Sequence, residues 1–100
     1  MTNRATKQDL ANVLDRINTA AGQNLAPWTR DRCENGKWTA NVGTYTLDWA
    51  YGGVRLVQLV TEGGGERDIT PRGTKRECLQ MMRAFEAGLE ARHLSFEYPL

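Results

Sequence analysis

The sequence predicts a two-layer α+β domain in which a helix, an antiparallel hairpin or three-stranded sheet, and a second helix follow one another (αβββα order). Two segments carry apolar residues at helical spacing, and the segment between them alternates apolar and polar residues around glycine turns. Because each helix and the hairpin has one apolar face, we expect both helices to cover the same face of the sheet. Residues 1–100 suit a single domain.

The first predicted helix covers residues 7–21. Thr6 is a favourable N-cap, and Asp9 lies three residues later, where its carboxylate would complete a capping box. Gly22 is a typical stop signal. The buried stripe of this helix is expected to contain Leu10, Val13, Leu14, Ile17, Ala20 and Ala21.

A first hairpin is predicted between a short strand at 29–33 and a strand at 37–42. The dipeptide between them, Asn35-Gly36, is the strongest signal for a type I′ turn. In the second strand, Trp38, Ala40 and Val42 alternate to one side.

A second hairpin is predicted over 44–60, closed by Gly52-Gly53. In this register Tyr51 lies opposite Val54, and three further pairs place an apolar set on one face: Trp49 with Leu56, Leu47 with Gln58, and Tyr45 with Val60. The other face carries Val57 and Leu59, which either another part of the chain or another molecule should cover.

A glycine loop is expected from Glu62 to Gly73, before the second helix. Thr74 is the predicted N-cap of this helix and Glu77 its capping-box partner, with an apolar stripe continuing to about Ala91. The tail, 92–100, alternates apolar residues and predicts an extra edge strand or a contact segment.

Composition narrows the functional classes. Thirteen Lys and Arg against twelve Asp and Glu give a net charge of +1, so a polyanion would have to bind a local patch. No run approaches the roughly 20 apolar residues that span a bilayer, and the N-terminus lacks a signal-peptide core, which predicts a cytoplasmic protein without membrane contact. Cys33 and Cys78 lack metal-site spacing, and we expect reduced thiols, with a disulfide as the alternative in a secreted chain.

Catalytic signals are weak. His93 is the single histidine, and nearby Ser95 lacks the glycine elbow of a nucleophile. The carboxylates Asp48, Glu62 and Glu66 form no tuned acid and base pair. We therefore expect a protein that is not an enzyme and needs no cofactor or metal.

Two candidate binding sets emerge. Glycine amides and cations around a helix start are typical of anion sites, and the set here is Gly63, Gly64, Gly65, Arg67, Arg72, Lys75 and Arg76. Acidic residues interleave with these cations, so the alternative is a simple connector. Aromatic residues that would anchor a protein interface, if exposed, are Trp28, Trp49, Tyr51 and Tyr98.

Two family resemblances bear on these sets. The element order and the TKRE helix start resemble the double-stranded RNA-binding domain, which implies phosphate contacts by Lys75 and Arg76, although that family's proline, glycine and histidine hairpin motif is missing. The pattern GxYxLxxAYGGxxL, followed by EGGG and KRE, covers about Asn41 to Leu89 and resembles small uncharacterised bacteriophage and prophage proteins. This second resemblance implies an accessory protein in the cytoplasm of a bacterial host.

The preferred hypothesis is a non-enzymatic protein-binding module that inhibits a host enzyme or defence complex. The alternative is a binder of nucleic acid, or of a nucleotide or phosphate, through the glycine loop and the basic helix start. The alternating tail and the second apolar sheet face favour a homodimer.

Overall fold

The computed structural model describes residues 4–31 and 36–97. The order of elements is α1 (Lys7–Ala20), β1 (Trp28–Asp31), β2 (Lys37–Ala40), β3 (Tyr45–Ala50), β4 (Gly53–Leu59), β5 (Glu66–Asp68) and α2 (Lys75–Glu97). These elements form a two-stranded sheet, β1-β2, a three-stranded antiparallel sheet, β3-β4-β5, and a helical layer. The predicted α+β class and the helix, strands, helix order are confirmed.

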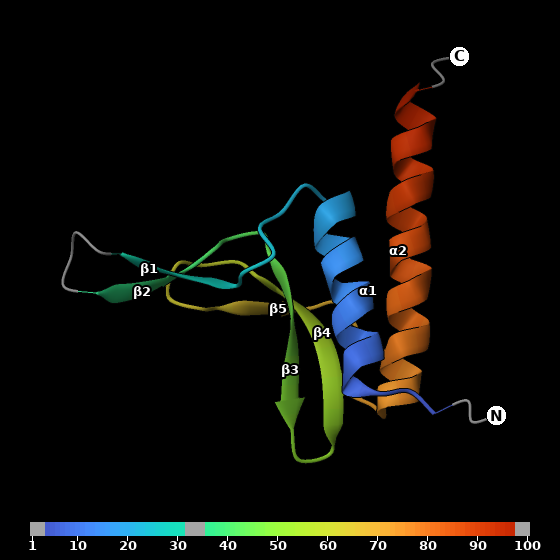
Figure 1. Ribbon diagram of the computed structural model, residues 1–100, viewed down its shortest axis with the longest axis horizontal. Coiled ribbons are helices and arrows are strands. Elements are labelled where there is room, and N and C mark those ends of the chain that lie inside the picture. The colour runs from blue at the N-terminus through green and yellow to red at the C-terminus, as the bar shows by residue number, and fades with distance from the viewer. Residues whose placement is uncertain (1–3, 32–35, 98–100) are drawn as a thin grey trace.

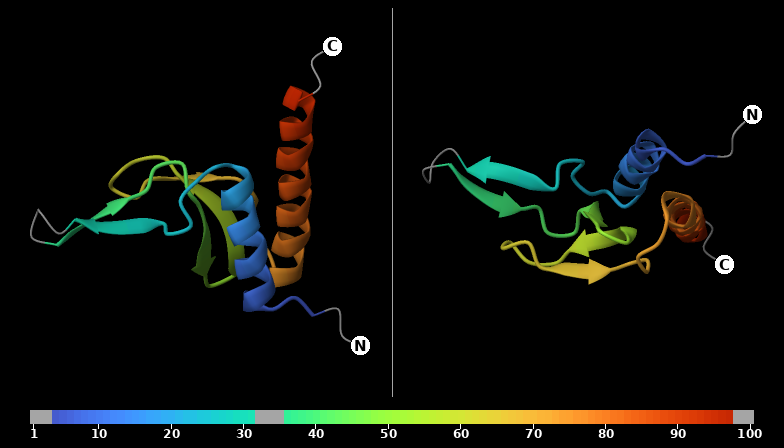
Figure 2. Two further views of the ribbon diagram at one scale, coloured as in Figure 1. Left: turned by 45° about the horizontal axis from the view of Figure 1, so that its top comes forward. Right: turned by 90° about the horizontal axis from the view of Figure 1, so that it is seen from below.

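Both helices lie side by side on one face of the three-stranded sheet and run in the same direction (Figure 1). The hairpin β1-β2 projects away from the helices (Figure 2). The main core lies between the helices and the sheet, and its buried members are Ala5, Leu10, Val13, Ile17, Tyr45, Val54, Leu56, Cys78, Leu79 and Met82. Phe85 packs edge-on against Tyr45, with ring centroids 5.3 Å apart.

The caps of both helices agree with the sequence signals. At α1, the Asp9 backbone amide donates a hydrogen bond to the Thr6 hydroxyl, and the Thr6 backbone amide donates one to the Asp9 carboxylate. These two bonds complete the predicted capping box. Gly22 follows the helix with φ of 71°, as a C-terminal glycine should. At α2, Thr74 and Glu77 form the same reciprocal pair.

The register of the second hairpin differs from the prediction by two residues. Ala50 pairs with Gly53, so Tyr51-Gly52 forms the turn instead of Gly52-Gly53. Gly53 is needed elsewhere: a Cβ on it would lie 2.2 Å from the Gly73 carbonyl oxygen, where the chain before α2 crosses the strand. Because the shift is even, each side chain keeps its predicted face.

The first hairpin and the glycine loop differ in part from the prediction. The strand expected at 29–33 is present as β1 over Trp28–Asp31, and Cys33 and Asn35 lie outside the described residues. Asp31 pairs with Lys37, whereas the predicted two-residue turn at Asn35-Gly36 would pair Glu34 with Lys37, so that turn prediction is wrong. The strand expected to reach Val42 ends at Ala40. The loop expected from Glu62 to Gly73 contains β5, whose Glu66, Arg67 and Asp68 pair with β4, because the glycines make a turn tight enough to return the chain along the sheet.

The C-terminal segment is also different from the prediction. Helix α2 continues through Glu97, so residues 92–97 are helical and do not form an edge strand. Tyr98 and the last two residues lie outside the described part. On the second sheet face, Val57 and Leu59 are buried within the chain itself, as the first of the two expected explanations required. The two observations that favoured a homodimer were the alternating tail and the second apolar sheet face, and the structure supports neither. The oligomeric state stays a prediction.

Candidate functional site

The glycine loop is the turn between β4 and β5, and its amides are largely engaged. The Gly64 amide donates to the Thr61 carbonyl at 3.0 Å, and the Gly65 amide donates to the Thr61 hydroxyl at 2.8 Å. A Cβ on Gly64 would lie 2.7 Å from the Trp28 ring. The loop therefore provides a flat surface for this tryptophan, and two of its three glycine amides cannot face an anion.

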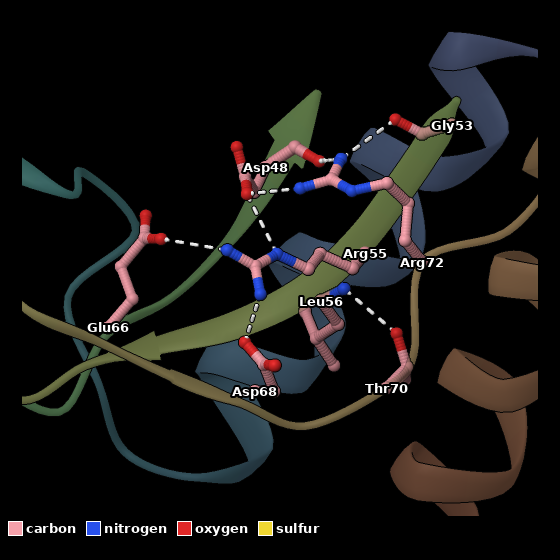
Figure 3. A network of polar contacts seen from close by, with 8 residues as sticks. All are labelled: Asp48, Gly53, Arg55, Leu56, Glu66, Asp68, Thr70 and Arg72. Carbon is pink, nitrogen blue, oxygen red and sulfur yellow. Dashed lines mark hydrogen bonds and ion pairs between the residues drawn. The ribbon is translucent and has the colours of Figure 1, made fainter. Parts of the chain in front are cut away.

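Arg72 belongs to an ion network on the sheet face opposite the helices (Figure 3). Its guanidinium donates to the Asp48 carboxylate at 2.6 Å and to the carbonyls of Asp48 and Gly53 at 3.1 and 3.0 Å. Arg55 shares the same Asp48 oxygen at 2.8 Å and also pairs with Glu66 and Asp68. The acidic residues beside the glycine loop thus neutralise Arg55, and Asp48 holds Arg72.

These contacts shift the ionisation of Asp48. Hydrogen bonds from Arg55 and Arg72 hold the pKa of the Asp48 carboxyl below its ordinary value of 3.8. The charged form is favoured because each guanidinium supplies a charge-assisted hydrogen bond to it. At Glu77, the hydrogen bonds with Thr74 likewise lower the carboxyl pKa.

The predicted anion-binding residues do not converge. Arg67 lies opposite Gln58, on the sheet face that carries the core, and donates to the Gln58 side chain at 2.6 Å. Arg72 binds on the other face. Lys75 and Arg76 are exposed at the start of α2. The structure brings none of these four cations together around the glycine loop, and anion binding by this set stays a prediction.

Two predicted interface residues lie at the end of the second hairpin. Tyr51 is fully exposed in the turn, and Trp49 is 43% exposed with the Lys7 ammonium 5.4 Å from its ring centre. The third, Trp28, is 39% exposed in β1. Tyr98 lies outside the described residues. The three described aromatic residues are therefore all surface residues.

The most continuous aromatic surface is one face of the hairpin β1-β2, which we call the tryptophan face. Cross-strand pairing places Trp28 opposite Ala40 and Arg30 opposite Trp38, so these four side chains share that face. Trp38 is 58% exposed, and the Arg30 guanidinium lies so close to Gly36 that a Cβ there would be 2.5 Å from it. The opposite face carries Thr29 and Thr39.

Trp38 and Arg30 were not among the site residues predicted from the sequence. Strand alternation places Trp38 and Ala40 on one side. A two-residue turn at Asn35-Gly36 would, however, set Cys33 opposite Trp38, whereas the structure pairs Trp38 with Arg30. What alternation does not reveal is that the helices cover a different sheet and leave this hairpin projecting. Exposure is a tertiary property, and it separates Trp38 from a core tryptophan.

The described side chains include one free cysteine thiol. Cys78 is a fully buried free thiol, and burial raises its pKa, which disfavours the reactive thiolate. Within residues 4–31 and 36–97 no group of three or more His, Cys, Asp or Glu side chains is arranged to hold a metal ion. In the same ranges no helix is both long and apolar enough to cross a membrane.

No family model, no curated protein and no solved structure matches the chain.

Proposed function

We propose that the protein is a non-enzymatic protein-binding module whose contact surface is the tryptophan face. One observation carries the proposal: Trp38, with 58% of its surface exposed, lies beside Arg30 and in line with Trp28 on a hairpin that projects from the core. Tryptophan and arginine are the side chains most enriched among residues that dominate interface energies.

The physical cost of this surface supports the proposal. An exposed indole ring leaves a large apolar area in water, and a two-stranded hairpin alone is only marginally stable. At the end of the tryptophan face nearer the core, Ala40 is buried and Trp28 packs against Gly64. Trp38, farther along the hairpin, remains exposed to solvent. A partner that covers Trp38 would remove apolar area from water and hold the hairpin in place.

The setting we propose is a phage or prophage accessory protein that binds a host protein and thereby inhibits a host enzyme or defence complex. The sequence resemblance supports that setting, and the small size and near-neutral charge of the chain are consistent with it. A nucleic-acid role through the glycine loop is less supported, because Arg72 and two glycine amides of that set are already engaged.

The proposal is tested by partner capture from bacterial lysate with two matched variants. Trp38→Ala removes the centre of the tryptophan face, whereas Thr39→Ala changes the next residue, which points to the other face. We expect a stoichiometric host protein to be retained by the wild type and by Thr39→Ala, and to bind roughly 30-fold more weakly to Trp38→Ala, as loss of a hot spot of about 2 kcal/mol requires.

Thermal unfolding of the variants provides the control for folding, since an exposed side chain contributes little to stability. Capture of the same partner in equal amounts by Trp38→Ala would contradict the proposed surface. The absence of any stoichiometric partner across several buffers and host lysates would contradict the proposed function. Sedimentation of the free protein tests the homodimer prediction separately.

A further inference from the structure

A groove of about 320 Å³ lies between the segment before α1 and one side of α2. It is separate from the tryptophan face and from the ion network, and no part of it involves the glycine loop. Leu79 and Ala5, each 6% exposed, provide apolar walls. The polar lining consists of Arg4, Asp9, Arg76, Gln80 and Arg83.

The three arginines of this groove are unpaired, in contrast to others in the chain. Arg16, Arg55 and Arg72 each form ion pairs, whereas within the described ranges Arg4, Arg76 and Arg83 form none. Their clustering is unfavourable without a counter-charge, because like charges in one groove repel each other. A ligand that supplies negative charge would relieve this repulsion.

The carboxylates of Asp9, Glu77 and Glu86 are engaged with other partners than these arginines. Asp9, the one acid in the groove, accepts the Thr6 amide at 3.0 Å as part of the α1 cap. Glu77 accepts the Thr74 amide at 2.9 Å, and Glu86 pairs with Arg16 at 3.0 Å. Three positive charges and one negative charge line the groove, which leaves an excess of two positive charges.

The spacing of the cations suits one compact anion. Arg76, Gln80 and Arg83 follow one another at intervals of four and three residues, so they lie along the same side of α2. The two arginine Cα atoms are about 10 Å apart along the helix axis, within reach of a shared group for two side chains of this length. Arg4 belongs to the segment before α1, which forms the other wall, and Gln80 lies between Arg76 and Arg83 along α2.

We propose that this groove binds a phosphomonoester of nucleotide size. A phosphate monoester carries roughly −1.5 to −2 charge near neutral pH, which matches the excess of two positive charges. A planar guanidinium group can bind phosphate in a bidentate manner, with two parallel N–H···O hydrogen bonds. The volume is near the lower limit for small-molecule sites, roughly 300 Å³, and the apolar walls suit the uncharged part of such a ligand. The net charge of the whole chain, +1, supplies no extended field for a polyanion.

Calorimetric titration at about 50 mM salt tests the site, since low salt preserves electrostatic affinity. The probes are AMP, adenosine and a single-stranded octathymidylate. We expect AMP to bind saturably and adenosine not to bind, because the phosphate supplies the charge. The double variant Arg76→Gln/Arg83→Gln should weaken AMP binding at least about tenfold, since two charge-assisted contacts are lost.

Lys75→Gln is the matched control, because it removes one exposed cation from the same helical turn without touching the groove. Its AMP affinity should stay within about twofold of the wild type, given that an exposed charge outside the site is screened. The assignment is overturned if AMP does not bind, if adenosine binds equally well, or if the double variant behaves like Lys75→Gln. Tighter binding of octathymidylate than of AMP overturns the monoester assignment. Because Trp38→Ala leaves the groove intact, a failure here is distinguishable from a failure of the proposed protein-binding function.

Discussion

Asn18 forms a polar connection between α1 and the first strand of the three-stranded sheet. It lies in the last turn of α1 and is completely buried. Its side-chain amide donates to the Tyr45 carbonyl at 3.0 Å, and its side-chain oxygen accepts the Tyr45 amide at 2.8 Å. The side chain therefore pairs with the first residue of β3 much as a neighbouring strand would. An asparagine within a helix carries no sequence signal for this role.

Replacing Asn18 with alanine should destabilise the protein by about 2–4 kcal/mol, because two buried backbone groups of Tyr45 lose their partners. Chemical denaturation measures this change. Asn12→Ala, at an exposed position of the same helix, is the control and should shift the free energy of unfolding by less than about 0.5 kcal/mol. Similar losses for the two variants would show that the Asn18 hydrogen bonds contribute nothing specific.

The three consecutive glycines differ in their structural requirements, and the difference can be measured. Gly64 has φ of 97° and faces the Trp28 ring, whereas a Cβ on Gly63 would meet nothing within 4 Å. Gly64→Ala should therefore cost about 1–3 kcal/mol, and Gly63→Ala should be close to neutral. Equal stability of the two variants in thermal unfolding would refute a packing role for Gly64.

Among the elements, the strands of the three-stranded sheet are connected by an ion network in addition to the apolar core. Asp48 on β3, Arg55 on β4, and Glu66 and Asp68 on β5 connect all three strands. Arg72 adds the segment that leads into α2. Because β5 has only three residues, all exposed, these ion pairs, the hydrogen bond from Arg67 to Gln58 and the β4 ladder are its main attachments.

This network predicts a specific acid sensitivity. The folded-state pKa of Asp48 lies below its ordinary value of 3.8. Its contribution to stability is therefore complete above that ordinary value, and it disappears as the pH falls through the lowered pKa. We expect Asp48→Asn to be less stable than the wild type at neutral pH, and the difference to shrink as the pH approaches about 2.

Denaturant midpoints at several pH values check this expectation. Asp15→Asn serves as the control, since Asp15 is an exposed carboxylate of α1 outside the network. A stability difference for Asp48→Asn that does not change with pH would argue against the ion pairs as its cause. A shift of the same size in Asp15→Asn would point to general charge effects instead.

Considered as a whole, the molecule is more extended than a typical domain of its length. Its radius of gyration is 15.2 Å, against about 13 Å for a compact chain of 100 residues. The hairpin β1-β2 extends to one side of the core, and the C-terminal turns of α2 extend past α1 (Figure 1). Such projecting elements leave surface uncovered, and the proposed protein-binding face lies on one of them.

Much of the architecture could be predicted because its signals are local. The capping pairs at Thr6 and Thr74 and the glycine after α1 involve groups within a few residues of each other, and each has the predicted geometry. The alternation of β3 and β4 assigns each side chain to a face. These assignments are correct even though the predicted register is wrong by two residues, because an even shift keeps each side chain on its face. Residue type and spacing suffice for such features.

The sequence by itself determined where both helices begin, their N-terminal caps, the faces of β3 and β4 and the α+β class, because these depend on neighbours along the chain. Only the tertiary structure decided which surfaces remain open. It placed Gly73 against Gly53 and so moved the turn, paired Arg72 with Asp48 and so withdrew it from the glycine loop, and left Trp38 exposed. The first two outcomes depend on residues 20 and 24 positions apart, and the third depends on which sheet the helices cover, so all three are set by packing of the whole chain.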